Sequence, residues 1–122
     1  MGLIKSFLGA SAAACLAVQA LAIELVMVEQ AGCVYCASWD AEIAPAYPNS
    51  PEGRFAPLRR VGLRALPDDL TVARRVMFTP TFLIVENGQE LGRLEGYPGE
   101  HFFWPVLDEL LKKHAGYKGE QG

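Results

Sequence analysis

The sequence predicts an α/β fold: a mixed sheet of about four strands, in the chain order β-α-β-α-β-β-α, with the helices packed on it. Three observations support this prediction: short runs of branched apolar residues, an amphipathic segment between the first two runs, and an Asn-Gly pair between the last two. A helix that connects two neighbouring strands makes them parallel, whereas an Asn-Gly hairpin makes them antiparallel. The length of 122 residues accommodates one such domain.

The first strand and the helix after it follow directly from the apolar pattern. Residues 23–29 form an apolar, branched run that is typical of a buried strand. A helix is expected from Cys33 onward, because apolar residues recur close to the helical period. They are Tyr35, Cys36, Trp39, Ile43 and Tyr47. Pro45 and Pro48 are expected to end or kink this helix, and the turn residues of 49–53 predict a surface loop.

A second strand and a second helix are predicted in the middle of the chain. The strand occupies residues 58–63, where apolar and polar side chains alternate weakly. Pro67, followed by Asp68 and Asp69, is typical of a helix start, because acidic side chains are favoured in the first turn. This short helix must end before Thr79, since the residue that precedes a proline avoids the helical conformation.

The last elements are a hairpin and a helix. Strands are predicted at residues 81–85 and 91–94, because the Asn-Gly pair at 87–88 is a strong hairpin signal between two apolar runs. An amphipathic helix follows, and its apolar face consists of Val106, Leu107, Leu110 and Leu111. Pro105 suits a first helical turn, which places the regular part of this helix from about residues 103–104.

Residues 1–22 differ in composition from the rest and are predicted to be a cleaved secretory signal peptide. Lys5 is their only charged residue, and an Ala-rich apolar run follows it. Ala20 and Ala22 then form the small-x-small pattern of a cleavage site. The protein is therefore expected to be exported, with Ile23 as its first mature residue.

Three alternatives for this segment stay open: a membrane anchor, a buried N-terminal helix, and a lipoprotein signal with Cys15 as the lipidated residue. The apolar run is shorter than the ~20 residues that a spanning helix needs. With cleavage, residues 23–122 form the mature domain, and its polar, Gly-rich end at 116–122 is expected to be a flexible tail. Cleavage also leaves two cysteines, Cys33 and Cys36.

These two cysteines predict thiol chemistry. A disulfide between residues three apart closes too short a loop to stabilise a domain by much, so reactivity explains the pair better. Cys33 lies at the start of the predicted helix, where unpaired N–H groups and the helix dipole favour a thiolate. Cys33 is therefore the predicted nucleophile, and Cys36, one turn further in, is the predicted resolving thiol.

A CxxC pair can also serve functions other than redox chemistry. A zinc site needs a second pair of ligands, and a c-type haem site needs a histidine where Ala37 stands. A copper chaperone that holds Cu(I) with the two thiolates remains an alternative, as does a binding module with a purely structural disulfide. The 11 basic residues against 14 acidic ones exclude a broad cationic surface for nucleic acid. We expect no metal and no cofactor.

The chain from residue 23 onward resembles the thioredoxin superfamily. The resemblance lies in three segments: EQAGCVYCASWDAEIAPAYPNSPEGR, APLRRV and TPTFLIVENGQELGRLEGYPGEHFFW. In detail they are similar to the periplasmic thioredoxin-like proteins of bacterial sulfur-oxidation (Sox) gene clusters, the SoxS type. The CVYC core also resembles the cores of disulfide isomerases and glutaredoxins.

The resemblance implies a thioredoxin-like fold and a periplasmic thiol–disulfide oxidoreductase. We expect the protein to be a monomer without a cofactor. The resemblance further implies exported protein partners, among them a Sox sulfur-carrier protein (SoxY) whose cysteine is kept competent. A membrane thiol–disulfide transporter is the implied electron donor.

The resemblance also implies a substrate-binding surface. Pro80 stands where thioredoxin-like proteins carry a cis-proline opposite the dithiol, and Thr79 before it would face the substrate. With Val34 and Tyr35, the residues between the cysteines, they are the predicted substrate-binding residues. One departure is Met27, which stands where typical thioredoxins have a buried aspartate. Glu29 is a candidate replacement for that carboxylate, but a structural role suits it equally well, so it is not counted as catalytic.

Overall fold

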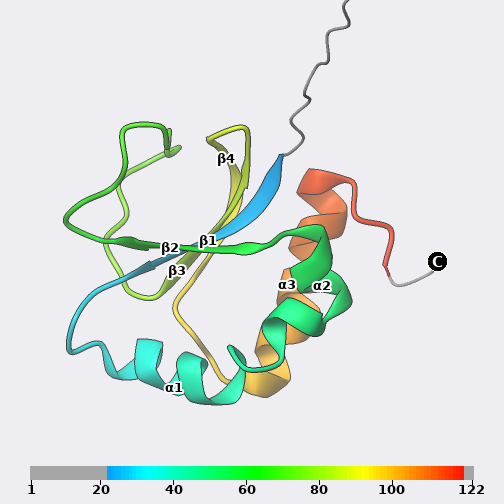
Figure 1. Cartoon of the computed structure of the whole chain (residues 1–122), viewed down its shortest axis with the longest axis horizontal. Coiled ribbons are helices and arrows are strands. Elements are labelled where there is room, and N and C mark those ends of the chain that lie inside the picture. The colour runs from blue at the N-terminus through cyan, green and yellow to red at the C-terminus, as the bar shows by residue number, and fades with distance from the viewer. Residues whose placement is uncertain (1–21, 120–122) are drawn as a thin grey trace, which may run out of the picture.

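The computed structural model describes residues 22–119, so nearly all of the predicted signal peptide lies outside the described residues. A four-stranded sheet with the order β2-β1-β3-β4 forms its centre (Figure 1). The strands are β1 (Ile23–Glu29), β2 (Leu58–Gly62), β3 (Thr81–Glu86) and β4 (Gln89–Glu95). The helices are α1 (Val34–Glu42), a 3₁₀-helix at Tyr47–Asn49, α2 (Pro51–Phe55) and α3 (Glu100–Ala115). Within the described residues no helix is both long and apolar enough to cross a membrane.

The strand pairing confirms the predicted mixed sheet. β1 runs parallel to β2, and the pairs β1–β3 and β3–β4 are antiparallel. β1 is central, and the four side chains from Leu25 to Val28 have no exposed surface. A strand whose two faces are both covered is apolar throughout, which explains the unbroken apolar run in the sequence.

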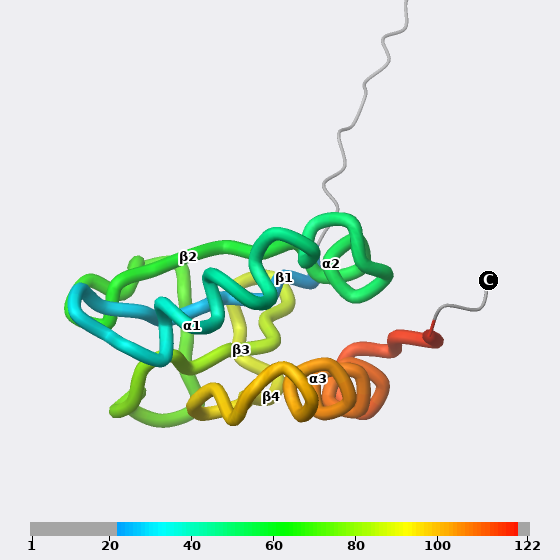
Figure 2. The backbone as a smooth tube through the Cα atoms, turned by 90° about the horizontal axis from the view of Figure 1, so that it is seen from below, coloured from blue at the N-terminus to red at the C-terminus, as the bar shows by residue number. Residues whose placement is uncertain are grey.

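The helices cover one face of the sheet (Figure 1, Figure 2). On that face Leu25 and Met27 of β1 share a core with aromatic residues from α1 and α3. Trp39 of α1 lies 5.2 Å from Phe82 and 5.8 Å from Phe103, measured between ring centroids, and all three rings are buried. Aromatic clusters of this kind bury large apolar areas, so α1 is fixed firmly on the sheet.

The opposite face is covered by the segment 63–80, and here the predicted second helix is wrong. This segment consists of turns and bends, with Leu70 and Val76 packed on Val26 and Val28 of β1. Ala73, in the middle of the segment predicted as a helix, is exposed. The backbone of Thr71 pairs with the β3–β4 hairpin instead of forming helical bonds: its N–H donates to the Gly88 carbonyl, and its carbonyl accepts the Glu90 N–H.

A buried ion pair fastens this segment to β4. Arg93 Nε lies 2.8 Å from Glu90 Oε2, and the two side chains are only 4% and 3% exposed. Glu90 also accepts the N–H of Ala73, and Arg93 donates to the carbonyl of Arg74. The pair therefore satisfies two backbone groups of an irregular segment that has few hydrogen bonds of its own.

Two helix boundaries also differ from expectation. The predicted loop at 49–53 contains α2, whose N-cap Ser50 accepts the N–H of Gly53 at 2.8 Å and precedes Pro51 in the first turn. A serine cap followed by proline is a helix start that the sequence already displayed. α3 begins at Glu100, not at 103–104, because the N–H of Phe103 reaches the Gly99 carbonyl, and Pro105 lies inside the helix.

The C-terminal segment is ordered further than the sequence suggested. Tyr117, placed in the predicted flexible tail, is 7% exposed, and its ring packs on Phe55 with 5.0 Å between centroids. Residues 116–119 therefore lie against the domain, and residues 120–122 are outside its described part.

Candidate active site

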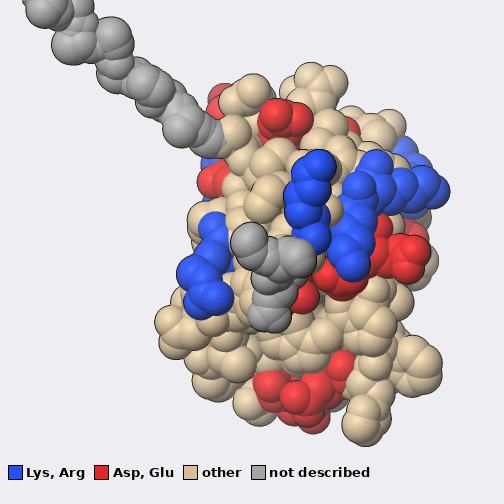
Figure 3. Space-filling model, turned by 90° about the vertical axis from the view of Figure 1, so that its right-hand side faces the viewer, with Lys and Arg blue, Asp and Glu red and all other residues tan. Residues whose placement is uncertain are grey.

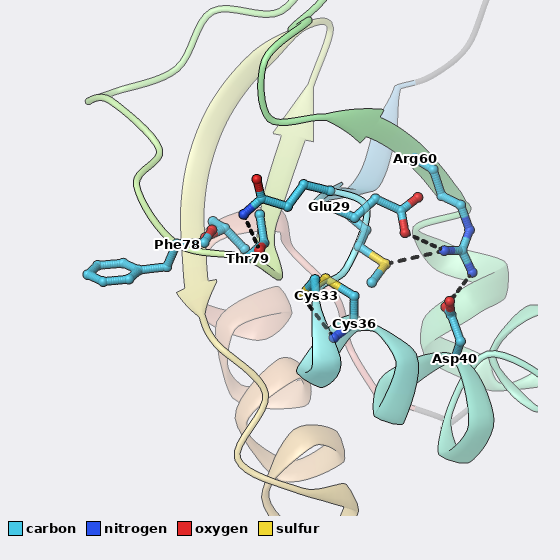
Figure 4. Close-up of a disulfide and its surroundings, with 10 residues drawn as sticks. Glu29, Cys33, Cys36, Asp40, Arg60, Phe78 and Thr79 are labelled. Atoms are coloured by element: carbon cyan, nitrogen blue, oxygen red, sulfur yellow. Dashed lines mark hydrogen bonds and ion pairs between the residues drawn. A yellow bond between two sulfur atoms is a disulfide. The ribbon is translucent and has the colours of Figure 1, made fainter.

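The two cysteines lie where β1 leads into α1 and form a disulfide with Cα atoms 5.2 Å apart (Figure 4). Cys33 is the N-cap of α1, and its Sγ accepts the backbone N–H of Cys36 at 3.1 Å. An N–H group directed at sulfur at the positive end of a helix stabilises a thiolate more than a thiol. After reduction, this geometry favours ionisation of Cys33.

The two sulfurs differ in access to solvent. Cys33 is partly exposed, whereas Cys36 is 5% exposed and belongs to the core cluster beneath α1. The difference arises because Cys33 precedes the first helical turn and Cys36 lies within it, next to the buried face that carries Trp39. A large partner can approach Cys33 more easily than Cys36.

Charged side chains from three elements meet beside the disulfide. Arg60 of β2 contacts Glu29 at the end of β1 at 3.0 Å and Asp40 of α1 at 2.8 Å. Its guanidinium lies 5.7 Å from the centroid of the Trp39 ring and 3.7 Å from the Met27 sulfur. Burial acts to lower the pKa of Arg60, but the hydrogen bond with Asp40 and the charge of Glu29 outweigh it and raise that pKa, so the group stays charged.

Glu29 and Asp40 also line a surface hollow of about 390 Å³ together with both cysteines. Met27, in contrast, has no titratable group and is fully buried. The carboxylates that line the hollow of the disulfide are therefore the two held by Arg60. Arg60 and Asp40 were not among the site residues predicted from the sequence. Arg60 could be placed near the site only from the parallel register of β1 and β2, which pairs Arg60 with Met27. That register is not evident from the sequence alone.

The four predicted substrate-binding residues lie at the dithiol end of the sheet. Val34 and Tyr35 are 71% and 62% exposed despite their apolar character. The Thr79–Pro80 peptide bond is cis, as predicted, and Thr79 lies close to the disulfide in Figure 4. The Gln30 side-chain amide donates to the Thr79 hydroxyl at 3.1 Å and so links the segment before Cys33 to the segment before β3.

Comparison with known proteins identifies the family. A scan against protein-family models finds no match, and neither does a comparison with curated proteins. Among solved structures, the chain is similar to the reduced form of the periplasmic thioredoxin SoxS from Paracoccus pantotrophus, with 56% identity and a TM-score of 0.72. The match covers 75% of this chain and 97% of that one. This chain is a SoxS-type thioredoxin.

The family assignment and the geometry of the site imply the same fold and the same activity. The strand order and the helices around the CxxC pair form the thioredoxin-like fold expected from the resemblance. As a SoxS-type thioredoxin with a Cys33–Cys36 disulfide, the protein is a thiol–disulfide oxidoreductase. The geometry at the N-terminus of α1 provides the physical basis of that activity, because it favours the thiolate on which exchange depends.

Proposed function

We propose that this SoxS-type thioredoxin works in the periplasm, as a monomer, and reduces or exchanges disulfides on exported proteins. Its substrate is the cysteine of a sulfur-oxidation carrier protein of the SoxY type. The observation that carries this proposal is the Cys33 sulfur at the start of α1 with the Cys36 N–H directed at it. The similarity to a periplasmic thioredoxin named SoxS supports the compartment, and the resemblance to the proteins of Sox gene clusters supports the pathway.

The reaction proceeds by two exchanges between sulfurs. The Cys33 thiolate attacks the partner disulfide, forms a mixed disulfide and releases one sulfur of the partner as a thiolate. Cys36 then loses its proton and attacks Cys33, which forms the intramolecular disulfide and releases the second partner sulfur. Two electrons pass to the partner in each cycle, and a membrane thiol–disulfide transporter then supplies two new electrons that reduce the Cys33–Cys36 disulfide.

The partner segment binds along the exposed apolar residues beside the disulfide. Val34 and Tyr35 contact it from the start of α1, and Thr79 contacts it from the other side, next to Pro80, which is buried in the free protein. Phe78, which is 60% exposed, extends this surface. Large apolar side chains exposed next to a reactive sulfur favour a protein substrate over a small polar disulfide.

The position of the mature N-terminus tests whether the protein is exported and cleaved. Cleavage after Ala22 follows from Lys5, the apolar run and the small-x-small pattern. N-terminal sequencing of protein recovered from the periplasm should therefore begin at Ile23. Recovery of the full-length chain from the cytoplasm would show that the signal peptide was assigned wrongly.

The substrate is tested with a purified carrier protein of the SoxY type whose cysteine is blocked as a mixed disulfide. The prereduced protein should restore the free thiol of the carrier, measured by mass spectrometry, faster than equimolar dithiothreitol does. This is expected because the Cys36 N–H and the N-terminus of α1 favour the thiolate form of Cys33, whereas an ordinary thiol with a pKa near 8.5 is mostly protonated at neutral pH.

A carrier that stays blocked while the protein still reduces other disulfides would disprove the assigned substrate and leave the redox activity standing. If no disulfide is reduced and anaerobic titration shows that Cu(I) binds far more tightly than to glutathione, the copper-chaperone function replaces this proposal. The two cysteine sulfurs would then be the ligands. Among residues 22–119, no group of three or more His, Cys, Asp or Glu is assembled as a metal site.

A further inference from the structure

A second hollow, of about 460 Å³, lies at the end of the sheet that carries the dithiol. Its lining consists of Leu63, Arg64, Leu66, Arg75, Val76 and Met77, and we call it the basic hollow. β1 and β2 run parallel and β3 runs antiparallel to β1. The residues that follow β2 and the residues that precede β3 therefore lie at the same end of the strands as the segment that leads from β1 to Cys33.

The arginines of the basic hollow differ from the others in the described chain. Residues 22–119 contain seven arginines, and five of them have a polar partner: Arg54, Arg59, Arg60, Arg74 and Arg93. Arg64 and Arg75, the remaining two, have no ion pair or side-chain hydrogen bond within the described residues, and both are exposed. Both unpaired guanidinium groups thus lie on one hollow, in a protein of net charge −3.

The basic hollow is linked to the surface around the disulfide through the residues that follow Met77. Met77, 63% exposed, belongs to its lining and is followed by Phe78 and Thr79. Thr79 is hydrogen-bonded to Gln30, and Gln30 lines the hollow that contains Cys33. A polypeptide whose disulfide is positioned at Cys33 can therefore extend over Phe78 and Met77 to reach the two guanidinium groups.

We infer that the basic hollow docks an acidic segment of the protein substrate, one that carries glutamate or aspartate beside apolar residues close to the reactive cysteine. This inference rests on the proposed function and names the chemistry of its partner. Arginine suits carboxylates because its planar fork can donate two hydrogen bonds at once. The apolar residues of the hollow contact the apolar neighbours of the carboxylates. Elsewhere the net negative charge of the protein repels an acidic partner, so this local positive charge also orients the encounter.

The test uses synthetic peptides with one cysteine bound to 2-mercaptoethanol as a mixed disulfide. Two peptides carry a Glu pair, placed before or after the cysteine, and each has a counterpart with Gln in place of Glu. The second-order rate constant for reduction by prereduced protein is measured by chromatography after acid quenching. The wild type should reduce at least one Glu peptide about fivefold faster than its Gln counterpart, and the ratio should fall with added salt. In the double variant Arg64→Gln/Arg75→Gln the ratio should fall to about one.

The matched control is Lys113→Gln/Lys118→Gln, which removes the same charge from the C-terminal end of α3 and the segment after it. The end of α3 lies on the side shown in Figure 3, where basic and acidic side chains lie next to one another. This control should keep the wild-type ratio. Equal rates for Glu and Gln peptides in the wild type, or an equal loss of preference in both double variants, would overturn the inference. Failure of the wild type to reduce any of the peptides would instead overturn the proposed function, and the inference with it.

Discussion

Replacement of Cys33 by serine is expected to abolish disulfide exchange, while replacement of Cys36 by serine leaves the first attack intact. Cys33 is the partly exposed sulfur that receives an N–H hydrogen bond at the start of α1, so its loss removes the nucleophile. Loss of a nucleophile lowers enzyme rates by at least about three orders of magnitude. Without Cys36, the mixed disulfide between Cys33 and the partner cannot be resolved and should accumulate.

The measurement is capture of that mixed disulfide from the periplasm of cells that express Cys36→Ser, followed by mass spectrometry of the bound protein. A sulfur-carrier protein linked through its cysteine is the expected product. The Cys33→Ser variant is the matched control, because it retains Cys36 but should trap nothing. If Cys33→Ser traps partners and Cys36→Ser does not, the nucleophile and the resolving thiol are the reverse of our assignment.

The strands were predictable from the sequence because their signals are local. The apolar run of 23–29 and the Asn-Gly pair at 87–88 coincide with β1 and the β3–β4 turn. The segment 63–80 was not predictable in the same way. Pro67 and two acidic residues resemble a helix start, but Thr71 bonds to Gly88 and Glu90, which are distant in the chain. These non-local hydrogen bonds outweigh a weak local propensity.

In the active site, too, local motifs were predictable from the sequence and contacts between distant segments were not. The spacing of Cys33 and Cys36 and the position of Pro80 predicted the dithiol and its opposing proline, because each is a short motif in one segment. The cluster around Arg60 could not be predicted, since Glu29, Arg60 and Asp40 come from β1, β2 and α1. Only the parallel register of β1 and β2 brings the three side chains together.

The second large effect concerns stability. Arg93→Met is expected to lower the free energy of unfolding by about 3 kcal/mol, because it leaves the Glu90 carboxylate buried without its partner. The two side chains are almost inaccessible to solvent, and Arg93 also holds the Arg74 carbonyl of the segment 63–80. Urea unfolding at pH 7 measures the change.

The double variant Glu90→Gln/Arg93→Met should recover part of the loss, since it buries no uncompensated charge. Equal stability of Arg93→Met and the wild type would show that solvent, rather than Arg93, balances the charge of Glu90.

The same ion pair makes stability depend on pH in the acid range. Burial acts to raise the pKa of Glu90, but the hydrogen bonds from Arg93 and from the Ala73 N–H outweigh it, so the folded-state pKa lies below the ordinary value of 4.5. A carboxyl with a depressed folded-state pKa contributes stability above its unfolded pKa, and the contribution is lost as the pH falls through the folded value. The wild type should therefore lose stability below about pH 4.5.

Glu90→Gln, which cannot titrate, should lose less stability between pH 7 and pH 3 in the same urea experiment. An identical decline in both proteins would mean that other carboxyl groups, such as Asp69 paired with Arg59, account for the whole acid sensitivity.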